Sequence, residues 1–253
     1  MKNLIKKIIL KLILLFLVLA VPIATYMIIE DDVQFAGNIN SIRGMNKYTI
    51  VAEFSSEYNK LSAVEKVEYI NKTGKELDKL FFYLSTIKTE DEFYKDLEDK
   101  LVSGDVENPC KIKEIKSVRI ENRKVDFKLI GRDKRILMIN LGTKLKEGHK
   151  ITVEIEYDIV NLNFITDVNN GRKIYVLEDW YPVAARYNGG WVLEQKNYNE
   201  EVNYYFVEMI VPEGFEVNSS GRLIEKIKRK GNYHFKFYSR SALGFNVNIV
   251  STK

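Results

Sequence analysis

The sequence predicts an all-β fold, an extended antiparallel β-sandwich or a saddle-like pair of sheets with one short helix, preceded by an N-terminal transmembrane helix. Short runs of aromatic and β-branched residues alternate with turn residues from about Tyr48 to the end of the chain, as expected of antiparallel strands. One segment, residues 89–101, spaces its apolar residues as a helix does. An uncharged and mostly apolar stretch, residues 12–29, lies near the start.

Residues 1–29 are predicted to form a signal anchor. Lys6, Lys7 and Lys11 precede the uncharged stretch, and acidic residues follow it at 30–32. About 18 residues at a rise of about 1.5 Å cover about 27 Å, just enough for the hydrocarbon layer of a bilayer. Lysines before the span and acids after it place the amino end in the cytoplasm and the rest outside. We therefore expect a single-pass protein of the cell membrane that contacts the lipid bilayer through this helix.

The competing interpretation of this segment is a cleaved signal peptide. Cleavage requires small residues in an A-x-A-like pattern after the apolar region. Residues 20–22 (A-V-P) do not fit this pattern, and residues 23–25 (I-A-T) are a weak substitute. The sequence favours a retained anchor.

The basic charge of the chain belongs to the anchor. The chain has 39 Lys and Arg against 35 Asp and Glu. Residues 1–29 hold four lysines and no acid, so 39 − 4 = 35 basic residues face 35 acidic ones in the exported part. The net charge therefore reports membrane topology, and we expect no nucleic-acid partner. A single cysteine, Cys110, permits no internal disulfide, so stability must come from packing.

The exported part is predicted to be a linker, residues 30–46, followed by one β-domain, residues 47–253. The linker is rich in Gly, Asn and Ser. Strands are expected at residues 48–54, 60–71, 79–84, 112–120, 124–130, 135–140, 150–158, 202–211, 215–218, 223–227 and 233–238. Breaks at 212–214 (P-E-G), 219–221 (S-S-G) and 230–232 (K-G-N) predict an antiparallel meander in the last part.

The predicted helix follows the third of these strands. Residues 89–92 (T-E-D-E) fit a capping box, Phe93, Leu97 and Leu101 recur every four residues, and Gly104 supplies a stop. We expect a short amphipathic helix with its acids exposed.

The order of several motifs resembles one known family. The blocks W-Y-P (180–182), G-W (190–191), P-x-G-F-x-V-x-x-S-G-x-L (212–223) and F-N-V (245–247) follow one another. Together with residues 48–84 and 137–157, they resemble the N-terminal β-domain of the aminopeptidase N-like (gluzincin) zinc metallopeptidases. The resemblance implies the same saddle-shaped β fold.

The catalytic motifs of that family are missing. Its zinc site uses H-E-x-x-H on a helix of a following domain, with a further Glu as ligand. This chain has two histidines, His149 and His234, which are 234 − 149 = 85 residues apart, and neither is followed by Glu. His149 fits a solvated turn and His234 an ordinary strand face. We expect no metal site, no cofactor and no catalytic residue in this chain alone.

A candidate interaction surface surrounds the W-Y-P block. In the resembled family the N-terminal domain lends the zinc domain an acid or amide that helps hold the free amino group of the substrate. The residues near that position are polar and aromatic, and they comprise Trp180, Tyr181, Arg186, Trp191, Glu194 and Gln195. The alternative interpretation is that the aromatic residues are buried anchors that pin a long connection.

Three functions are consistent with the sequence. The first is a membrane-anchored, extracytoplasmic, non-catalytic module that binds or scaffolds a partner. The second is the N-terminal half of a split or truncated zinc aminopeptidase whose H-E-x-x-H domain is supplied by another chain, which the end of the sequence after residues 248–250 favours. The expected partner is accordingly a zinc catalytic domain in trans or a peptide. The third is an unrelated adhesion sandwich. An H-E-x-x-H motif in the reading frame after Lys253 would favour the second function.

Overall fold

The structure, a computed structural model, describes residues 44–84, 111–131, 134–162, 164–167, 170–178, 180–193 and 201–252. Apart from Gly44 they belong to one compact unit, Met45–Lys253; the other unit is Met1–Gly44. The predicted anchor with its flanking lysines, most of the predicted linker and the predicted helix at 89–101 lie outside the described residues. Within these ranges there is no α-helix, and none of the elements is a helix able to span a membrane.

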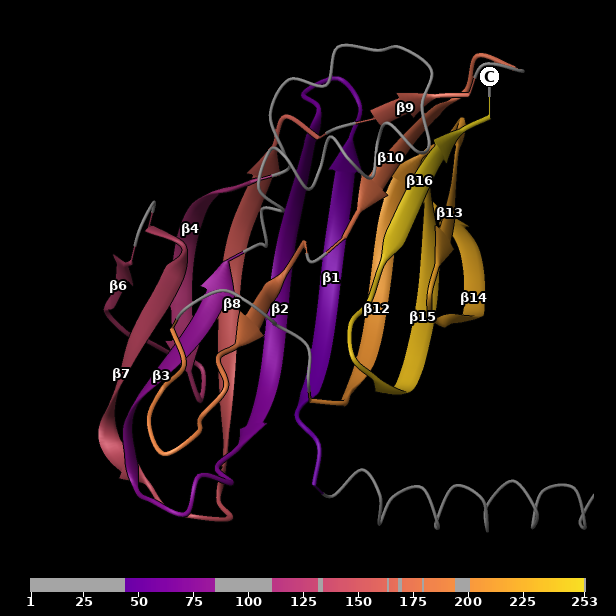
Figure 1. Cartoon of the computed structure of the whole chain (residues 1–253). Helices are drawn as coiled ribbons and strands as arrows, with labels where there is room; N and C mark the ends of the chain where they lie inside the picture. Colours follow the sequence, from indigo (N-terminus) through magenta and orange to yellow (C-terminus); the bar gives the residue numbers. More distant parts are fainter. Residues whose placement is uncertain are drawn as a thin grey trace, which may run out of the picture. The chain divides into compact units, whose positions relative to one another are not determined.

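The largest sheet, called the large sheet below, has eight strands (Figure 1). Their order is β14 (Arg222–Arg229), β15 (Asn232–Ala242), β12 (Asn203–Pro212), β1 (Lys47–Ser55), β2 (Lys60–Ile70), β8 (Lys150–Val160), β4 (Lys111–Ile120) and β5 (Arg123–Lys124).

Two four-stranded sheets hold the remaining strands of the described residues. The β16 sheet has the order β13 (Phe215–Ser219), β16 (Val247–Ser251), β10 (Lys173–Leu177) and β9 (Phe164–Thr166). The β3 sheet has the order β11 (Pro182–Ala184), β3 (Leu77–Leu84), β7 (Ile136–Leu145) and β6 (Phe127–Ile130). Figure 1 shows β10 and β16 on the side of the large sheet where β12 and β15 lie, and β3 and β7 on the side where β8 and β4 lie.

Alternation along the central strands explains the sandwich. In β1, every second side chain from Tyr48 to Phe54 is buried, while Val51 and Glu53 are exposed. Because side chains of a strand point alternately to the two faces, one face of the large sheet is apolar and must be covered. Burying each large apolar side chain contributes about 1.5–3 kcal/mol.

Both small sheets supply this cover. One hydrophobic cluster joins inward residues of the large sheet, such as Ile50, to Leu80 of β3 and to Tyr175 and Ile249 of the β16 sheet. The all-β class and the β-sandwich predicted from the sequence are therefore confirmed.

The structure corrects the predicted connectivity in two places. β1 pairs with β12 in parallel, with Lys47 opposite Tyr204, so the large sheet is not wholly antiparallel. The predicted meander is wrong at β13, which pairs with β16 instead of β12 or β14. Gly214 has φ +88°, a conformation that glycine adopts without strain, and it turns the chain out of the large sheet after Pro212. The Gly214 carbonyl then accepts a 2.8 Å hydrogen bond from the Thr252 amide.

One glycine sits where a side chain cannot fit. A Cβ atom on Gly221 would lie 2.5 Å from a ring carbon of Phe245 and 3.0 Å from the Tyr238 carbonyl oxygen. The Phe245 ring is fully buried, and the Tyr238 oxygen is backbone. Glycine at this point of the S-S-G turn is therefore needed for the close approach of Phe245.

One inward position of β2 holds an acid. Glu65 is fully buried between Ile50 of β1 and Ile155 of β8, and neither carboxyl oxygen has a hydrogen-bond partner. Burial raises the pKa of Glu65 well above its ordinary value of 4.5, and the Tyr157 hydroxyl, which approaches without a well-formed hydrogen bond, offsets only part of the rise. The neutral acid is favoured, because an unpaired carboxylate in a core is far more costly.

Replacing Gly221 by alanine is expected to destabilise the domain by about 1–3 kcal/mol, because the new methyl group forces Phe245 or the backbone to move. Gly190→Ala is the matched control, since a Cβ atom at that position would meet nothing within 4 Å. Thermal unfolding followed by near-UV circular dichroism compares the two variants. Equal midpoints for Gly221→Ala and the wild type would show that Phe245 is not held against this turn.

Stability is expected to fall with rising pH because of Glu65. The folded state holds the Glu65 proton more tightly than the unfolded state does, so the stabilising contribution is complete below about pH 4.5 and is lost as the pH rises toward the folded-state pKa. Across that window the cost grows by up to about 1.4 kcal/mol per pH unit. Glu65→Gln removes this titration, so its advantage over the wild type should grow between pH 5 and pH 8 in denaturant unfolding. Parallel pH profiles would contradict the assignment.

Candidate functional site

Two predicted site residues, Trp180 and Tyr181, are buried in the sandwich. The Trp180 indole Nε1 donates a 3.0 Å hydrogen bond to the Phe245 carbonyl, and the Phe245 amide donates a 3.0 Å bond to the Tyr181 hydroxyl. Both polar backbone groups of Phe245 are thus satisfied by side chains of the W-Y-P block. These bonds join the W-Y-P block to the segment before β16.

A group of tyrosines extends from this joint into the large sheet. The Tyr181 ring lies 5.9 Å from that of Tyr48 and 5.7 Å from that of Tyr205, in edge arrangements, and Tyr48 stacks on Tyr205 at 5.2 Å. The Tyr48 hydroxyl accepts a 3.2 Å hydrogen bond from the Ala184 amide. Burial raises the pKa values of Tyr48 and Tyr181 well above their ordinary range, and the neighbouring Tyr205 hydroxyl adds to the rise in both. These hydroxyls stay protonated and act as structural hydrogen-bonding groups.

The following residues form a tight loop over the β3 sheet. The Val192 amide bonds the Arg186 carbonyl at 2.9 Å, and Tyr187 and Trp191 form an isolated β-bridge. The half-buried Trp191 ring contacts Tyr187 and Phe81, with ring centroids 5.4 and 5.2 Å away. Phe81 belongs to a second, smaller apolar cluster on the other face of β3. Trp191 therefore covers part of the outer face of the β3 sheet and keeps part of its own surface in contact with solvent.

The structure separates the six residues of the predicted surface. Trp180 and Tyr181 are structural anchors, so they offer no exposed contact area. Arg186 and Trp191 are half-buried in the 185–193 loop. Glu194 and Gln195 lie outside the described residues. The role of this region in binding a partner stays a prediction. Among its four described residues, Arg186 and Trp191 are partly exposed at the surface.

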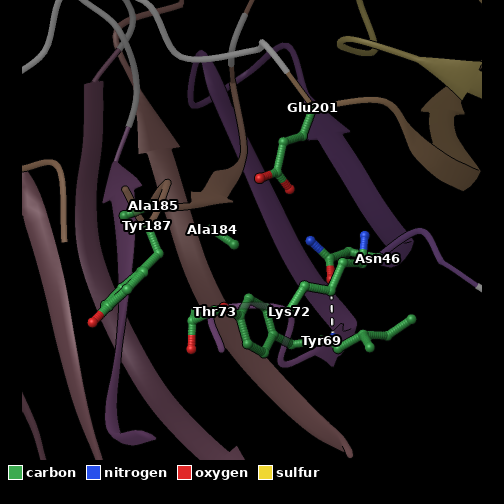
Figure 2. Close-up of a pocket in the computed structure, with 9 residues that line it drawn as sticks. Asn46, Tyr69, Lys72, Thr73, Ala184, Ala185, Tyr187 and Glu201 are labelled. Atoms are coloured by element: carbon green, nitrogen blue, oxygen red, sulfur yellow. Dashed lines mark hydrogen bonds between the residues drawn. The ribbon is translucent and has the colours of Figure 1, made fainter. Parts of the chain in front are cut away.

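A small pocket lies beside this loop (Figure 2). Its volume is about 40 Å³, and its lining comprises Asn46, Tyr69, Ile70, Lys72, Thr73, Ala184, Ala185, Tyr187 and Glu201. Figure 2 shows the Glu201 carboxylate directed into the space above Asn46 and Tyr69. Burial raises the pKa of Tyr69, and the charges of Glu201 and Glu147 add to the rise. At about 10–15 Å³ per water, the pocket has room for a few waters or one small polar group.

The residues that line this pocket were not predicted from the sequence. Asn46 falls within the predicted linker, whereas the structure buries it. The Asn46 side-chain oxygen Oδ1 accepts a 3.0 Å hydrogen bond from the Ile70 amide. The Asn46 backbone carbonyl accepts another, also of 3.0 Å, from the Tyr204 amide. The partners come from β2 and β12, which no local pattern reveals.

Neither histidine belongs to a metal site in the structure. His149 is exposed in the turn before β8, as predicted, with Nδ1 3.1 Å from the Glu147 carbonyl. His234 lies on β15, as predicted, with Nδ1 2.8 Å from the Glu208 carboxylate. Over the ranges that the structure covers, no three His, Cys, Asp or Glu side chains form a group that could hold a metal ion.

Known protein structures share the fold of this chain, although no sequence comparison finds a relative. No family model matches the sequence, and no curated protein matches it. The M1 zinc metallopeptidase of Deinococcus radiodurans, in a variant bound to a Tyr-Ser-Ala substrate, matches with a TM-score of 0.52 and 10% identity over 81% of this chain and 41% of its own. Native leukotriene A4 hydrolase of Saccharomyces cerevisiae matches with a TM-score of 0.50 and 12% identity over 81% and 28%.

The chain thus spans well under half the length of the proteins that it matches. The resemblance predicted from the sequence is confirmed at the level of the fold. The chain has the fold of the N-terminal β-domain of M1 zinc metallopeptidases.

Proposed function

We propose that the chain is a membrane-anchored, extracytoplasmic, non-catalytic β-domain that acts as a binding or scaffolding module. One observation carries the proposal: 81% of the chain matches M1 metallopeptidases, yet the match accounts for 41% of the Deinococcus radiodurans chain. The matched part is the β-domain, and the zinc chemistry of the family belongs to a different domain.

The residue inventory supports a non-catalytic role. A catalytic zinc usually has three protein ligands drawn from His, Asp, Glu and Cys. The full sequence contains two histidines and one cysteine. His234 already bonds Glu208, and His149 lies in an exposed turn beside the Glu147 carbonyl. Neither has a second histidine one helical turn away.

The membrane part of the proposal rests on the sequence. Residues 12–29 are uncharged and are flanked by lysines before and acids after. This asymmetry favours a cytoplasmic amino end and an exported β-domain. The balance of 35 basic and 35 acidic residues after the anchor fits a domain that does not bind nucleic acid.

A zinc catalytic domain supplied in trans is the second candidate. The observation that favours it is the 185–193 loop, where Trp191 and Leu193 are half-buried beside the apolar cluster of Phe81 and Tyr83. Aromatic side chains of this kind are enriched at protein interfaces. The outer face of the β3 sheet is the place where such a domain would dock, and the reading frame after Lys253 is where its H-E-x-x-H motif would be sought.

The purified full chain is expected to bind no stoichiometric zinc and to release no amino acid from an aminoacyl anilide. The reason is that its sequence has no H-E-x-x-H motif to supply paired histidine ligands and a general base. Metal analysis after dialysis and a chromogenic assay check both points, with a known M1 aminopeptidase as positive control. Hydrolysis that a chelator abolishes would contradict the non-catalytic assignment. Hydrolysis that appears only when a second, separately encoded zinc domain is added would favour the alternative.

The full chain is expected to stay in the membrane at its uncleaved mass of 29.5 kDa, with the β-domain outside the cytoplasm. Alkaline phosphatase, which folds only after export, should be active when fused after Lys253, and a cytoplasmic fluorescent reporter at the same place should be dark. Intact mass measurement of the carbonate-washed membrane fraction tests retention. A shorter product in the soluble fraction would show that residues 1–29 are a cleaved signal peptide.

A further inference from the structure

The sequence contains two Asn-Gly pairs, Asn170-Gly171 and Asn188-Gly189, and both asparagines are exposed. In such a pair the backbone nitrogen of the glycine can attack the side-chain amide carbon of the asparagine. Glycine favours this attack, because it has no Cβ to obstruct the approach and its backbone rotates freely. The two pairs are chemically alike, so any difference in their reactivity comes from the fold.

Hydrogen bonds hold both reacting groups of the pair at 170–171. The Gly171 amide, whose nitrogen would attack, donates a 2.7 Å hydrogen bond to the Asp167 carbonyl. The Asn170 Oδ1 atom accepts a 3.0 Å hydrogen bond from the Arg172 amide. Reaction at this pair breaks the first bond and reorients the amide group that makes the second. The pair therefore reaches a reactive geometry only when this turn opens locally.

The pair at 188–189 lacks this protection. Within the ranges that the structure describes, neither the Asn188 side chain nor the Gly189 amide has a hydrogen-bond partner. The backbone there is open as well: Gly189 has φ +66°, and a Cβ atom on Gly189 or Gly190 would meet nothing within 4 Å. Solvent therefore reaches both reacting groups without any opening of the loop.

We propose that Asn188 is a site of spontaneous deamidation. The Gly189 nitrogen gives its proton to solvent and forms a bond to Cγ of Asn188. The bond from Cγ to the side-chain nitrogen breaks, and ammonia leaves a cyclic succinimide. Water then opens the ring at either carbonyl and yields aspartate, or isoaspartate with the backbone running through the former side-chain carbon. The net change exchanges ammonia for water, so no oxidant or reductant takes part.

The products alter the loop that presents Trp191. The Asn188 amide donates a 2.8 Å hydrogen bond to the Gly190 carbonyl, and Tyr187 and Trp191 form the β-bridge around it. Isoaspartate lengthens the backbone of this tight loop by one atom, and both products add a negative charge. The extra atom shifts Trp191 out of register with Tyr187 and loosens its packing on Phe81. The proposal depends neither on membrane anchoring nor on a partner.

Peptide mapping tests the site. The purified full chain is incubated at mildly alkaline pH, digested with trypsin at intervals and measured by mass spectrometry. Cleavage after Arg186 and Lys196 releases residues 187–196, which contain Asn188 as their single asparagine. Fragment ions locate the change at Asn170 in residues 151–172. The same incubation in urea gives the intrinsic reactivity of both pairs. Asn188→Gln is the control variant, since its longer side chain disfavours ring closure.

In the folded chain, Asn188 should convert at least about tenfold faster than Asn170, because two hydrogen bonds that oppose the reaction are each worth a factor of a few. In urea the two asparagines should convert at similar rates. The wild-type chain should also show a slow change in tryptophan emission as Trp191 loosens. Asn188→Gln should fold as the wild type does, because the side chain is exposed, and should show no such change.

The remaining outcomes contradict the proposal. Equal rates in the folded chain, or faster conversion of Asn170, would show that the hydrogen bonds of the 167–172 turn do not decide reactivity. Conversion of both asparagines in urea but of neither in the folded chain would show that the 185–193 loop protects Asn188. Conversion at Asn188 with the same emission as Asn188→Gln would refute the effect on Trp191.

Discussion

The structure depends on the double hydrogen bond between Phe245 and the W-Y-P block. Trp180 and Tyr181 satisfy both backbone polar groups of Phe245, although they lie 65 and 64 residues away in the sequence. Because buried backbone groups without partners are costly, this pair of bonds holds the segment after β15 in one place. The Phe245 ring is then pressed against Gly221, and β16 is positioned to pair with both β10 and β13. The three sheets meet at this joint.

The central strands could be predicted from the sequence almost residue by residue. β1 and β2 are long and alternate regularly, and their observed bounds differ from the predicted ones by one residue at each end or less. The strands that escaped prediction, such as β9 and β11 with three residues each, are too short to show a period. Their structure comes from the partners that they pair with, which lie far away in the sequence. The same reason explains β13, whose sequence fits a meander equally well.

The candidate site shows the same limit. Aromatic residues in a connection can be anchors or a binding surface, and the pattern W-Y-P does not distinguish them. Trp180 and Tyr181 are anchors because they hydrogen-bond Phe245, which is distant in the sequence. Trp191 stays partly exposed because it packs on Phe81 at the outer face of the β3 sheet. Glu65 breaks the apolar alternation of β2 and also escaped prediction, because a strand pattern tells which face a residue occupies and not whether an acid there has a partner.

The ion pairs on the outer face of the large sheet make this face a poor binding surface. Its charges are neutralised locally: Lys66 and Arg119 both pair with Glu154, and Lys60 and Lys116 both pair with Asp158. Burial alone would raise the pKa of Glu154, but Arg119 and Lys66 outweigh it and the pKa is lowered, so the carboxylate stays ionised.

A face of this kind has little net field with which to attract a charged ligand, and its ion pairs would have to be desolvated to form an interface. Recognition of a charged ligand through this face is therefore disfavoured. The β3-sheet loop with half-buried Trp191 combines apolar area with polar neighbours and would lose fewer ion pairs on binding.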